Sequence, residues 1–129
     1  MKAEENKSLK ALNTFGIDAR ARHYLKLTSK AQLAKLSSLP FFNRDNLLVL
    51  GGGSNILFTQ DYEGLVIHNC IPGIQEVKSQ SESVWVRCGA GVEWHDLVMY
   101  CVKRGLGGIE NLSLIPGKCG AAPMQNIGA

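Results

Sequence analysis

Three glycines that follow a short apolar segment are the first residues in this sequence whose types and spacing could do chemistry. Residues 47–58 are LLVLGGGSNILF, in which Ser54 and Asn55 follow the glycines. Glycines allow positive φ angles and a close approach of ligand to backbone, and successive N–H groups in such a turn form an anion-binding nest. The stretch is therefore either a phosphate-binding turn or a tight turn after a buried strand, and taken alone it favours neither.

This turn fits neither of the two familiar nucleotide-binding patterns. A dinucleotide fingerprint G-x-G-x-x-G that starts at Gly51 requires glycine at position 56, which is Ile56. The P-loop pattern fails at the same position and lacks the lysine that should follow it. Because no basic residue lies within the turn, we expect backbone dipoles to hold most of any bound phosphate.

A second candidate binding segment occupies residues 105–129, which contain six glycines and two prolines and show little periodicity. The amides of Gln125 and Asn126 can both donate and accept hydrogen bonds, which suits a heterocycle with alternating carbonyls and ring nitrogens. The alternative is a structural loop whose amides satisfy its own backbone.

Other kinds of chemistry find little support in the residue pattern. The four cysteines, at positions 70, 88, 101 and 119, form no C-x-x-C pair, so we predict reduced and mostly buried thiols and no metal site. The three histidines lie far apart, and no Ser-His-Asp pattern or G-x-S-x-G elbow is present. We therefore expect the histidines to be structural.

Composition indicates the class of protein. With 45% hydrophobic and 19% charged residues, the 129-residue chain has the balance of a soluble globular domain. The net charge of +3 comes from scattered lysines and arginines, which gives nucleic-acid binding little support. No segment resembles a signal peptide or a membrane span, so we predict a cytoplasmic protein with no membrane or obligate protein partner.

The elements that must position these turns can be predicted from apolar spacing. Residues 1–12 are predicted to be a flexible leader and residues 22–27 a strand. Ser29 and Gln32 fit a capping box, which predicts a helix through residue 39 that Pro40 ends. Residues 46–50 and 65–69 are continuous apolar runs, typical of strands covered on both faces. This order predicts a small βαβ unit with parallel pairing.

The pattern changes after Cys70. Residues 74–78 and 84–88 flank a polar linker and alternate in hydrophobicity, which predicts an antiparallel hairpin with one buried face. A helix follows the GAG turn at 89–91. Its apolar stripe has the spacing i, i+3, i+4, i+7 and i+8, and consists of Trp94, Leu97, Val98, Cys101 and Val102. Gly105 suits the position just after its end.

Four motifs, taken together, resemble the UDP-N-acetylenolpyruvoylglucosamine reductase family. They are NTFGI at 13–17, LGGGSNIL at 50–57, GAGVEWHDLV at 89–98 and IPGKCGAAPMQNIGA at 115–129. The resemblance covers the chain from about residue 12 onward. It implies an α+β, vanillyl-alcohol-oxidase-type (PCMH) FAD-binding fold. A small βαβ lobe would span residues 13–70, and an incomplete second lobe with antiparallel strands would span residues 71–129.

The resemblance also implies non-covalent FAD as the cofactor and assigns residues to it. Along the pyrophosphate it places Gly51, Gly53, Ser54 and Asn55. Near the flavin and ribityl chain it places Pro116, Gly117, Gly120, Gln125, Asn126 and Gly128. Further cofactor-binding candidates are Leu50, Gly52, Ile115, Ala121 and Ala122, while Thr14, Gly89 and Gly91 would shape the cleft. Where Ala121 and Ala122 stand, family members often carry small polar residues, so hydroxyl contacts would be absent here.

The family's reaction passes a hydride from NADPH through FAD to UDP-N-acetylglucosamine enolpyruvate, which gives UDP-N-acetylmuramate for peptidoglycan synthesis. In the family, the catalytic arginine, the proton-donating serine and a late glutamate all lie beyond the position that matches Ala129. We therefore expect an FAD-binding N-terminal fragment that is inactive by itself. The alternatives are a non-catalytic nucleotide-binding module or another FAD-linked oxidoreductase of the same fold.

Overall fold

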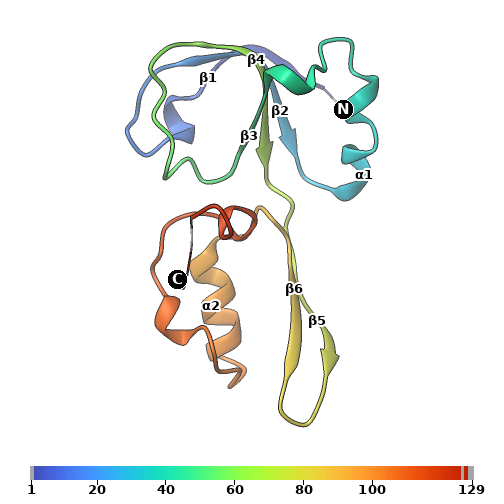
Figure 1. The fold of residues 1–129 in the computed structure, drawn as a ribbon, viewed down its shortest axis with the longest axis vertical. Coiled ribbons are helices and arrows are strands. Elements are labelled where there is room, and N and C mark those ends of the chain that lie inside the picture. Colours follow the sequence, from blue (N-terminus) through green and yellow to red (C-terminus); the bar gives the residue numbers. More distant parts are fainter. Residues whose placement is uncertain (1, 126, 128–129) are drawn as a thin grey trace.

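The computed structural model describes residues 2–125 and 127, and these residues form two sheets with short helices around them (Figure 1). A four-stranded sheet has the order β1-β2-β4-β3, and a separate hairpin pairs β5 with β6. The strands are β1 (Glu4–Ser8), β2 (Arg20–Leu27), β3 (Leu47–Leu50), β4 (Tyr62–Asn69), β5 (Ile74–Ser79) and β6 (Val84–Cys88). The α-helices are α1 (Lys30–Leu33) and α2 (Trp94–Val102). Five 3-10 turns are Lys10–Leu12, Leu36–Ser38, Arg44–Asn46, Glu110–Leu112 and Cys119–Ala121.

Strand β4 is the centre of the larger sheet. Both β2 and β3 run parallel to it, which confirms the predicted parallel pairing, although β4 separates the two strands. Successive side chains of a strand point to opposite faces. Val66 therefore joins one buried cluster with Tyr24 and Leu50, while Leu65 and Ile67 join the other. Two packed faces on one short sheet supply the apolar burial that holds this part of the chain together.

The first residues of the chain are not the flexible leader that the sequence predicts. Strand β1 pairs antiparallel with β2, and the fully buried Leu9 follows it. The prediction was wrong because EENKS has no apolar alternation. An edge strand can be held by main-chain hydrogen bonds and one apolar anchor, which leave no pattern in local sequence.

The predicted helix of residues 30–39 is also much shorter in the structure. The capping box forms as predicted, because Gln32 Oε1 accepts the Ser29 N–H at 3.2 Å. Helix α1 nevertheless ends at Leu33, which is 47% exposed, while Leu36 is buried. A single buried leucine gives too little tertiary packing to sustain a longer helix.

Strand β3 corrects another expectation. The sequence predicts a strand covered on both faces, but β3 lies at the edge of the sheet and Val49 is 61% exposed. A short apolar run does not distinguish a central strand from an edge strand, because that difference depends on which strands pair.

The remaining elements follow the sequence prediction closely. Strands β5 and β6 pair antiparallel, with exposed Trp85 and Arg87 alternating with half-buried Val86 and Cys88, so the predicted inner face is only partly buried. In α2 only Val98 and Cys101 of the predicted stripe are buried. Gly105 has φ of +67° and its N–H donates to the Val102 carbonyl, while Leu106 N–H donates to Cys101. These bonds form a Schellman motif, and Gly105 occupies the position after the helix end that the sequence predicts for it. Among the described residues, no helix has the length and apolar character needed to cross a membrane.

Candidate functional site

The glycine turn begins where β3 ends, and the chain near Thr14 holds it in place. Thr14 donates both its backbone N–H and its Oγ1 hydroxyl to the Gly53 carbonyl, at 3.0 and 3.4 Å. Gly53 has φ of +68°, and a Cβ atom there would overlap the Leu12 carbonyl oxygen. Only glycine fits this close approach of two backbones.

A buried asparagine, for which no role was predicted from the sequence, supports this contact. Asn13 is 8% exposed, and its Nδ2 donates to the carbonyls of Leu9 and Ile17 at 2.8 and 2.9 Å. Its Oδ1 accepts the Ile17 N–H at 3.0 Å. Asn13 thus closes the loop that carries Thr14. Its place in the NTFGI motif was the only available signal, since loop asparagines follow no periodicity.

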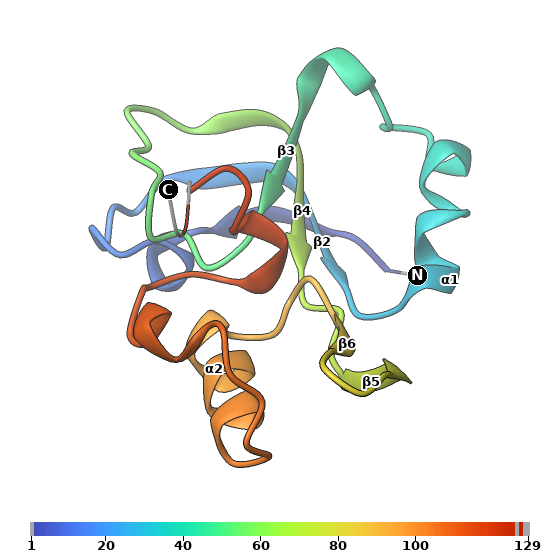
Figure 2. The same ribbon diagram turned by 60° about the horizontal axis from the view of Figure 1, so that its bottom comes forward.

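The C-terminal segment lies against the same turn, as Figure 2 shows for the red part of the ribbon near the end of β3. A Cβ on Gly52 would lie 3.4 Å from Gly117 Cα, and one on Gly51 would lie 3.6 Å from Ala121 Cβ. Gln125 Nε2 donates to Ser54 Oγ at 3.4 Å. The two segments that the sequence predicts to bind a ligand therefore meet in space, although about 70 residues separate them.

Two adjoining clefts lie at this junction. One has a volume of about 270 Å³ and is lined by residues 49–56 with Ala121, Met124 and Gln125. The other, of about 180 Å³, shares four of these residues and adds Asn69, Ala90 and Gly120. Among the described residues, no charged side chain lines either cleft. A negatively charged ligand would meet backbone groups and neutral side chains there, without repulsion from a carboxylate.

The turn at 89–91 forms hydrogen bonds both with the residues that precede β5 and with the C-terminal segment. Gly89 and Gly91 donate their N–H groups to Gly73 and Ile71 at 2.7 and 2.9 Å. Gly120 N–H donates to the Ala90 carbonyl at 3.0 Å, and a Cβ on Gly120 would lie 2.6 Å from Ala90 Cβ. The turn thus places Gly120 beside the smaller cleft.

The other predicted site residues lie in different places. Leu50 to Asn55 all line the larger cleft, whereas Ile115, Pro116, Gly117 and Ala122 line neither cleft. Gly117 contacts the turn at Gly52 and has φ of +117°. Asn126 and Gly128 lie outside the described residues.

Lys118 lies near the turn, which the sequence does not indicate. A Cβ on Gly51 or Gly52 would be 3.7 Å from Lys118 Cγ, and the Lys118 ammonium pairs with Glu93. The lysine side chain is only 18% exposed. The aliphatic part of Lys118 therefore lies against the turn, while its ammonium group is paired with Glu93.

The contacts of the cysteines and histidines indicate structural rather than catalytic roles. Cys88 and Cys119 place their sulfur atoms 3.3 Å apart, and burial raises the pKa of both thiols, that of Cys119 to about 12. Of the four cysteines only Cys101 is buried, so the expectation of mostly buried thiols was wrong. His95 Nδ1 pairs with Ser113 Oγ, and His23 stacks on Phe41. The described residues contain no group of three metal-ligating side chains.

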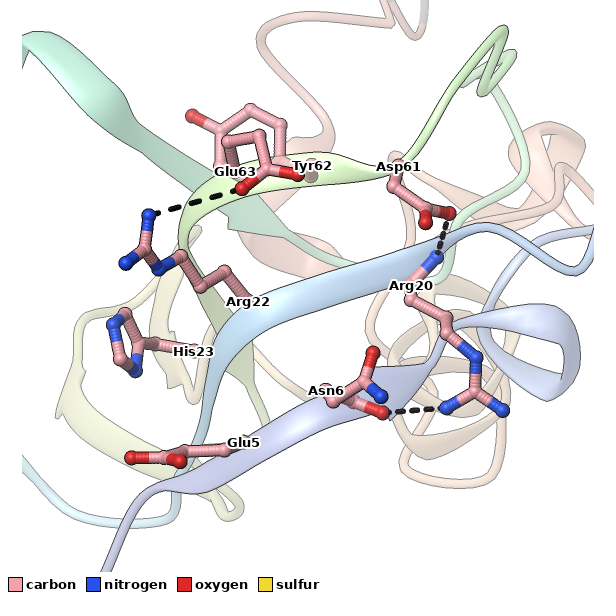
Figure 3. Close-up of a pocket in the computed structure, with 8 residues that line it drawn as sticks. All are labelled: Glu5, Asn6, Arg20, Arg22, His23, Asp61, Tyr62 and Glu63. Atoms are coloured by element: carbon pink, nitrogen blue, oxygen red, sulfur yellow. Dashed lines mark hydrogen bonds and ion pairs between the residues drawn. The ribbon is translucent and has the colours of Figure 1, made fainter.

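A separate cavity of about 360 Å³ lies on the larger sheet and is strongly charged (Figure 3). Its charged groups are largely paired with protein groups. Arg20 donates to the Asp61 carboxylate through its backbone N–H at 2.8 Å and to the Asn6 carbonyl through Nη1 at 2.7 Å. Arg22 lies 3.8 Å from Glu63. These contacts indicate that the charged groups of the cavity serve the fold. The cavity shares no lining residue with the two clefts at the glycine turn.

Comparison with known proteins agrees with this geometry. Residues 21–129 match the FAD binding domain family, and the chain belongs to that family. Its fold is the predicted vanillyl-alcohol-oxidase-type FAD-binding fold.

The individual relatives are more specific. The chain is 51% identical over its full length to UDP-N-acetylenolpyruvoylglucosamine reductase of Amoebophilus asiaticus, of which it covers 38%. It is 51% identical over 117 residues to the reductase of Neisseria gonorrhoeae, of which it covers 34%. The crystal structure of the Thermus caldophilus reductase matches 95% of the chain with a TM-score of 0.67 and 26% identity, and the chain covers 41% of it. The predicted resemblance is confirmed, and the chain spans between about one third and two fifths of these relatives.

Proposed function

We propose that this chain is the FAD-binding part of a UDP-N-acetylenolpyruvoylglucosamine reductase, which uses NADPH to reduce UDP-N-acetylglucosamine enolpyruvate. The observation that carries the proposal is the uncharged cleft in which the glycine turn meets Ala121, Met124 and Gln125. The cleft lies in a member of the FAD binding domain family. The similar proteins from Amoebophilus asiaticus and Neisseria gonorrhoeae are both named UDP-N-acetylenolpyruvoylglucosamine reductase. The partners are then small molecules, and the protein works in the cytoplasm on a cell-wall precursor.

The residues of the cleft fit FAD. Its pyrophosphate is an anion, and Gly51 to Asn55 offer backbone N–H groups and two neutral polar side chains. Residues 117–125 would lie towards the flavin, where Gln125 can donate and accept hydrogen bonds. The division into FAD-binding lobes at 13–70 and 71–129 is part of this proposal, and the two separate sheets support it.

The chain's own contribution to the reaction is binding and orientation. FAD, when bound, supplies the capacity to accept a hydride and pass it on. The Gln125–Ser54 hydrogen bond connects the glycine turn to the segment 117–125, and the Gly120–Ala90 hydrogen bond connects that segment to the 89–91 turn. A rigid cleft lowers the entropy that the cofactor loses on binding.

FAD is expected to bind saturably to the purified chain, with a change in flavin absorbance and fluorescence. Acid precipitation should release all of the colour, because the described cleft offers no cysteine or histidine for a covalent link. Ser54→Asp places a carboxylate in the cleft and should weaken binding at least about tenfold through charge repulsion. Ser83→Asp makes the same change on the exposed hairpin turn and should leave the affinity unchanged. Equal affinities in the two variants, or no saturable binding at all, would contradict the proposal.

The chain saturated with FAD is expected not to oxidise NADPH when UDP-N-acetylglucosamine enolpyruvate is added. This expectation rests on the family resemblance, which assigns catalysis to residues beyond the position that matches Ala129. Loss of NADPH absorbance measures the reaction, and the full-length Amoebophilus asiaticus reductase serves as positive control. Sustained turnover by the chain would show that its described residues suffice for catalysis.

A further inference from the structure

Two of the four cysteines lie side by side where the hairpin meets the C-terminal segment. Cys88 is the last residue of β6, and Cys119 begins the 3-10 turn Cys119–Ala121. Although 31 positions separate them in the sequence, their sulfur atoms are 3.3 Å apart. Both residues are half-buried, whereas Cys101 is buried in α2 and Cys70 directly follows β4. Cys88 and Cys119 thus form a pair of neighbouring thiols that the proposed function does not use.

Main-chain hydrogen bonds hold the two segments of this pair together. The Cys119 N–H donates to the Val92 carbonyl at 2.8 Å, and the Gly120 N–H donates to the Ala90 carbonyl at 3.0 Å. Both acceptors belong to the stretch that directly follows Cys88. The backbone positions of the two cysteines are therefore fixed relative to each other.

The contact suits a covalent bond between the two sulfur atoms. Because an S–S bond is about 2.0 Å long, the sulfur atoms must approach from 3.3 Å by about 1.3 Å. The backbones cannot supply this movement, since a Cβ on Gly120 would already lie 2.6 Å from Ala90 Cβ. Rotation of the two cysteine side chains can supply it. A disulfide would therefore form on the existing backbone.

We propose that Cys88 and Cys119 are a redox modification site, which a low-molecular-weight disulfide such as oxidised glutathione converts to an intrachain disulfide. The thiolate of one cysteine attacks a sulfur atom of the oxidant, so that a mixed disulfide forms and one glutathione thiolate leaves. The second cysteine loses its proton and attacks the protein sulfur of the mixed disulfide, which releases the second glutathione thiolate. Two protein thiols are thereby oxidised, and one oxidised glutathione is reduced to two thiols that take up the two protons.

The resting state of the pair is the dithiol. Burial raises the pKa of both thiols, that of Cys119 to about 12, so both carry their protons at neutral pH. Because the thiolate is the attacking species, exchange with the oxidant is slow near pH 7. A reducing thiol buffer therefore keeps the site reduced, and only sustained oxidation converts it.

The disulfide would connect one wall of the clefts to the hairpin. Gly120 and Ala121 follow Cys119 and line the smaller cleft, whereas Cys88 belongs to β6. Closing a loop of 31 positions restricts the unfolded chain and so stabilises the folded state.

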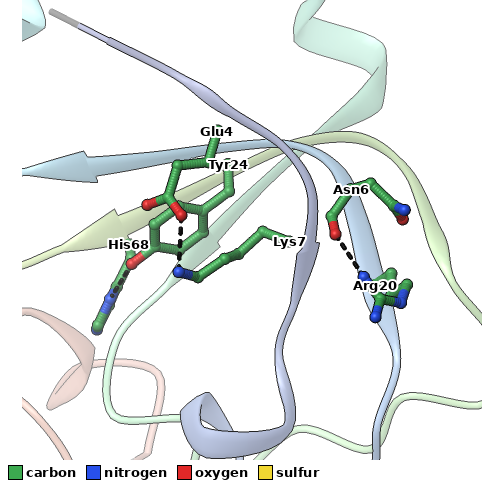
Figure 4. Close-up of polar contacts among 6 residues, drawn as sticks. All are labelled: Glu4, Asn6, Lys7, Arg20, Tyr24 and His68. Carbon is green, nitrogen blue, oxygen red and sulfur yellow. Dashed lines mark hydrogen bonds and ion pairs between the residues drawn. The ribbon is translucent and has the colours of Figure 1, made fainter.

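The larger sheet should keep its contacts on oxidation, because its strands contain neither cysteine. Its close polar pairs are Tyr24 with His68 at 2.8 Å and Lys7 with Glu4 at 2.7 Å (Figure 4). These pairs join β1, β2 and β4 within the sheet, so the new bond would act on the hairpin and the C-terminal segment.

Peptide mapping of the purified chain tests the pairing. After incubation with oxidised glutathione at about pH 8.5, where more thiolate is present, Cys88 of the wild type should be joined to Cys119, with no glutathione on either residue. Dithiothreitol should restore both thiols. Cys119→Ser should stop at a mixed disulfide with glutathione on Cys88. Cys70→Ser, the matched control at a half-buried cysteine outside the pair, should form the same disulfide as the wild type.

Thermal unfolding shows whether the bond fits the existing backbone. The oxidised wild type should unfold on the order of 10 °C above the reduced protein, and Cys119→Ser should show no such difference. Glutathione retained on Cys88 or Cys119 of the wild type, a disulfide from either to Cys70 or Cys101, or a midpoint that does not rise on oxidation would overturn the inference. Mapping of the wild type decides the pairing even if a variant fails to fold.

Discussion

Replacing Gly53 with alanine is expected to destabilise the protein by more than about 3 kcal/mol and to abolish FAD binding. The residue has φ of +68°, and the new Cβ would overlap the Leu12 carbonyl oxygen and lie 2.9 Å from Asn13 Cα. These atoms belong to backbone, which cannot rotate away as a side chain can. Relief of the overlap must separate Gly53 from Thr14, whose two hydrogen bonds hold the turn. Urea unfolding followed by circular dichroism, together with FAD titration, measures both effects.

Gly16→Ala is the matched control for this substitution. Gly16 has nearly the same φ, +64°, but a Cβ there meets nothing within 4 Å among the described residues. It should therefore lose only the backbone strain of a left-handed alanine, about 1 kcal/mol. If the two variants lost equal stability, the overlap at Leu12 would not be the reason that position 53 requires glycine.

The second large effect is expected from Asn13→Ala, which should lower the free energy of unfolding by about 2–4 kcal/mol. The substitution removes three hydrogen bonds and leaves the carbonyls of Leu9 and Ile17 without these partners, and both Leu9 and Asn13 are buried. Because this loop carries Thr14, FAD affinity should fall together with stability. The same urea unfolding and FAD titration measure these changes.

Two further variants test whether the lost hydrogen bonds of Asn13 cause this loss of stability. Asn13→Asp keeps an acceptor for the Ile17 N–H but loses both donated bonds, so it should be destabilised as well. Asn43→Ala makes the alanine substitution at an exposed asparagine that accepts one hydrogen bond from the Asp45 N–H, and it should cost about 1 kcal/mol. An Asn13→Ala variant no less stable than Asn43→Ala would exclude a supporting role for Asn13.

Both predictions concern the same chain of contacts. Asn13 closes the loop, Thr14 holds the Gly53 carbonyl, and the glycine turn forms one wall of the cleft. Residues 9–14, most of which were predicted to be a flexible leader, thus support the glycine turn of the candidate site. The polar composition of β1 concealed this, because main-chain pairing with β2 needs no apolar pattern.

The sequence by itself determined the features that depend on local pattern. Apolar runs placed β2 and β4, and alternation placed the β5–β6 hairpin, to within a few residues. The stripe from Trp94 to Val102 predicted α2 with its glycine ending. Ile56 stands where both the dinucleotide fingerprint and the P-loop pattern require glycine, so the glycine turn belongs to neither class. Four ordered motifs then predicted the FAD-binding fold, and the matching family confirms that prediction.

Only the tertiary structure decided which distant groups meet. It placed Lys118 beside Gly51 and Gly52, Gln125 against Ser54, and Cys119 beside Cys88. It also made β3 an edge strand and ended α1 after Leu33. The physical reason is the same in each case. Periodicity records which face of an element is buried, whereas strand order, helix length and backbone contacts depend on partners that lie far away in the chain.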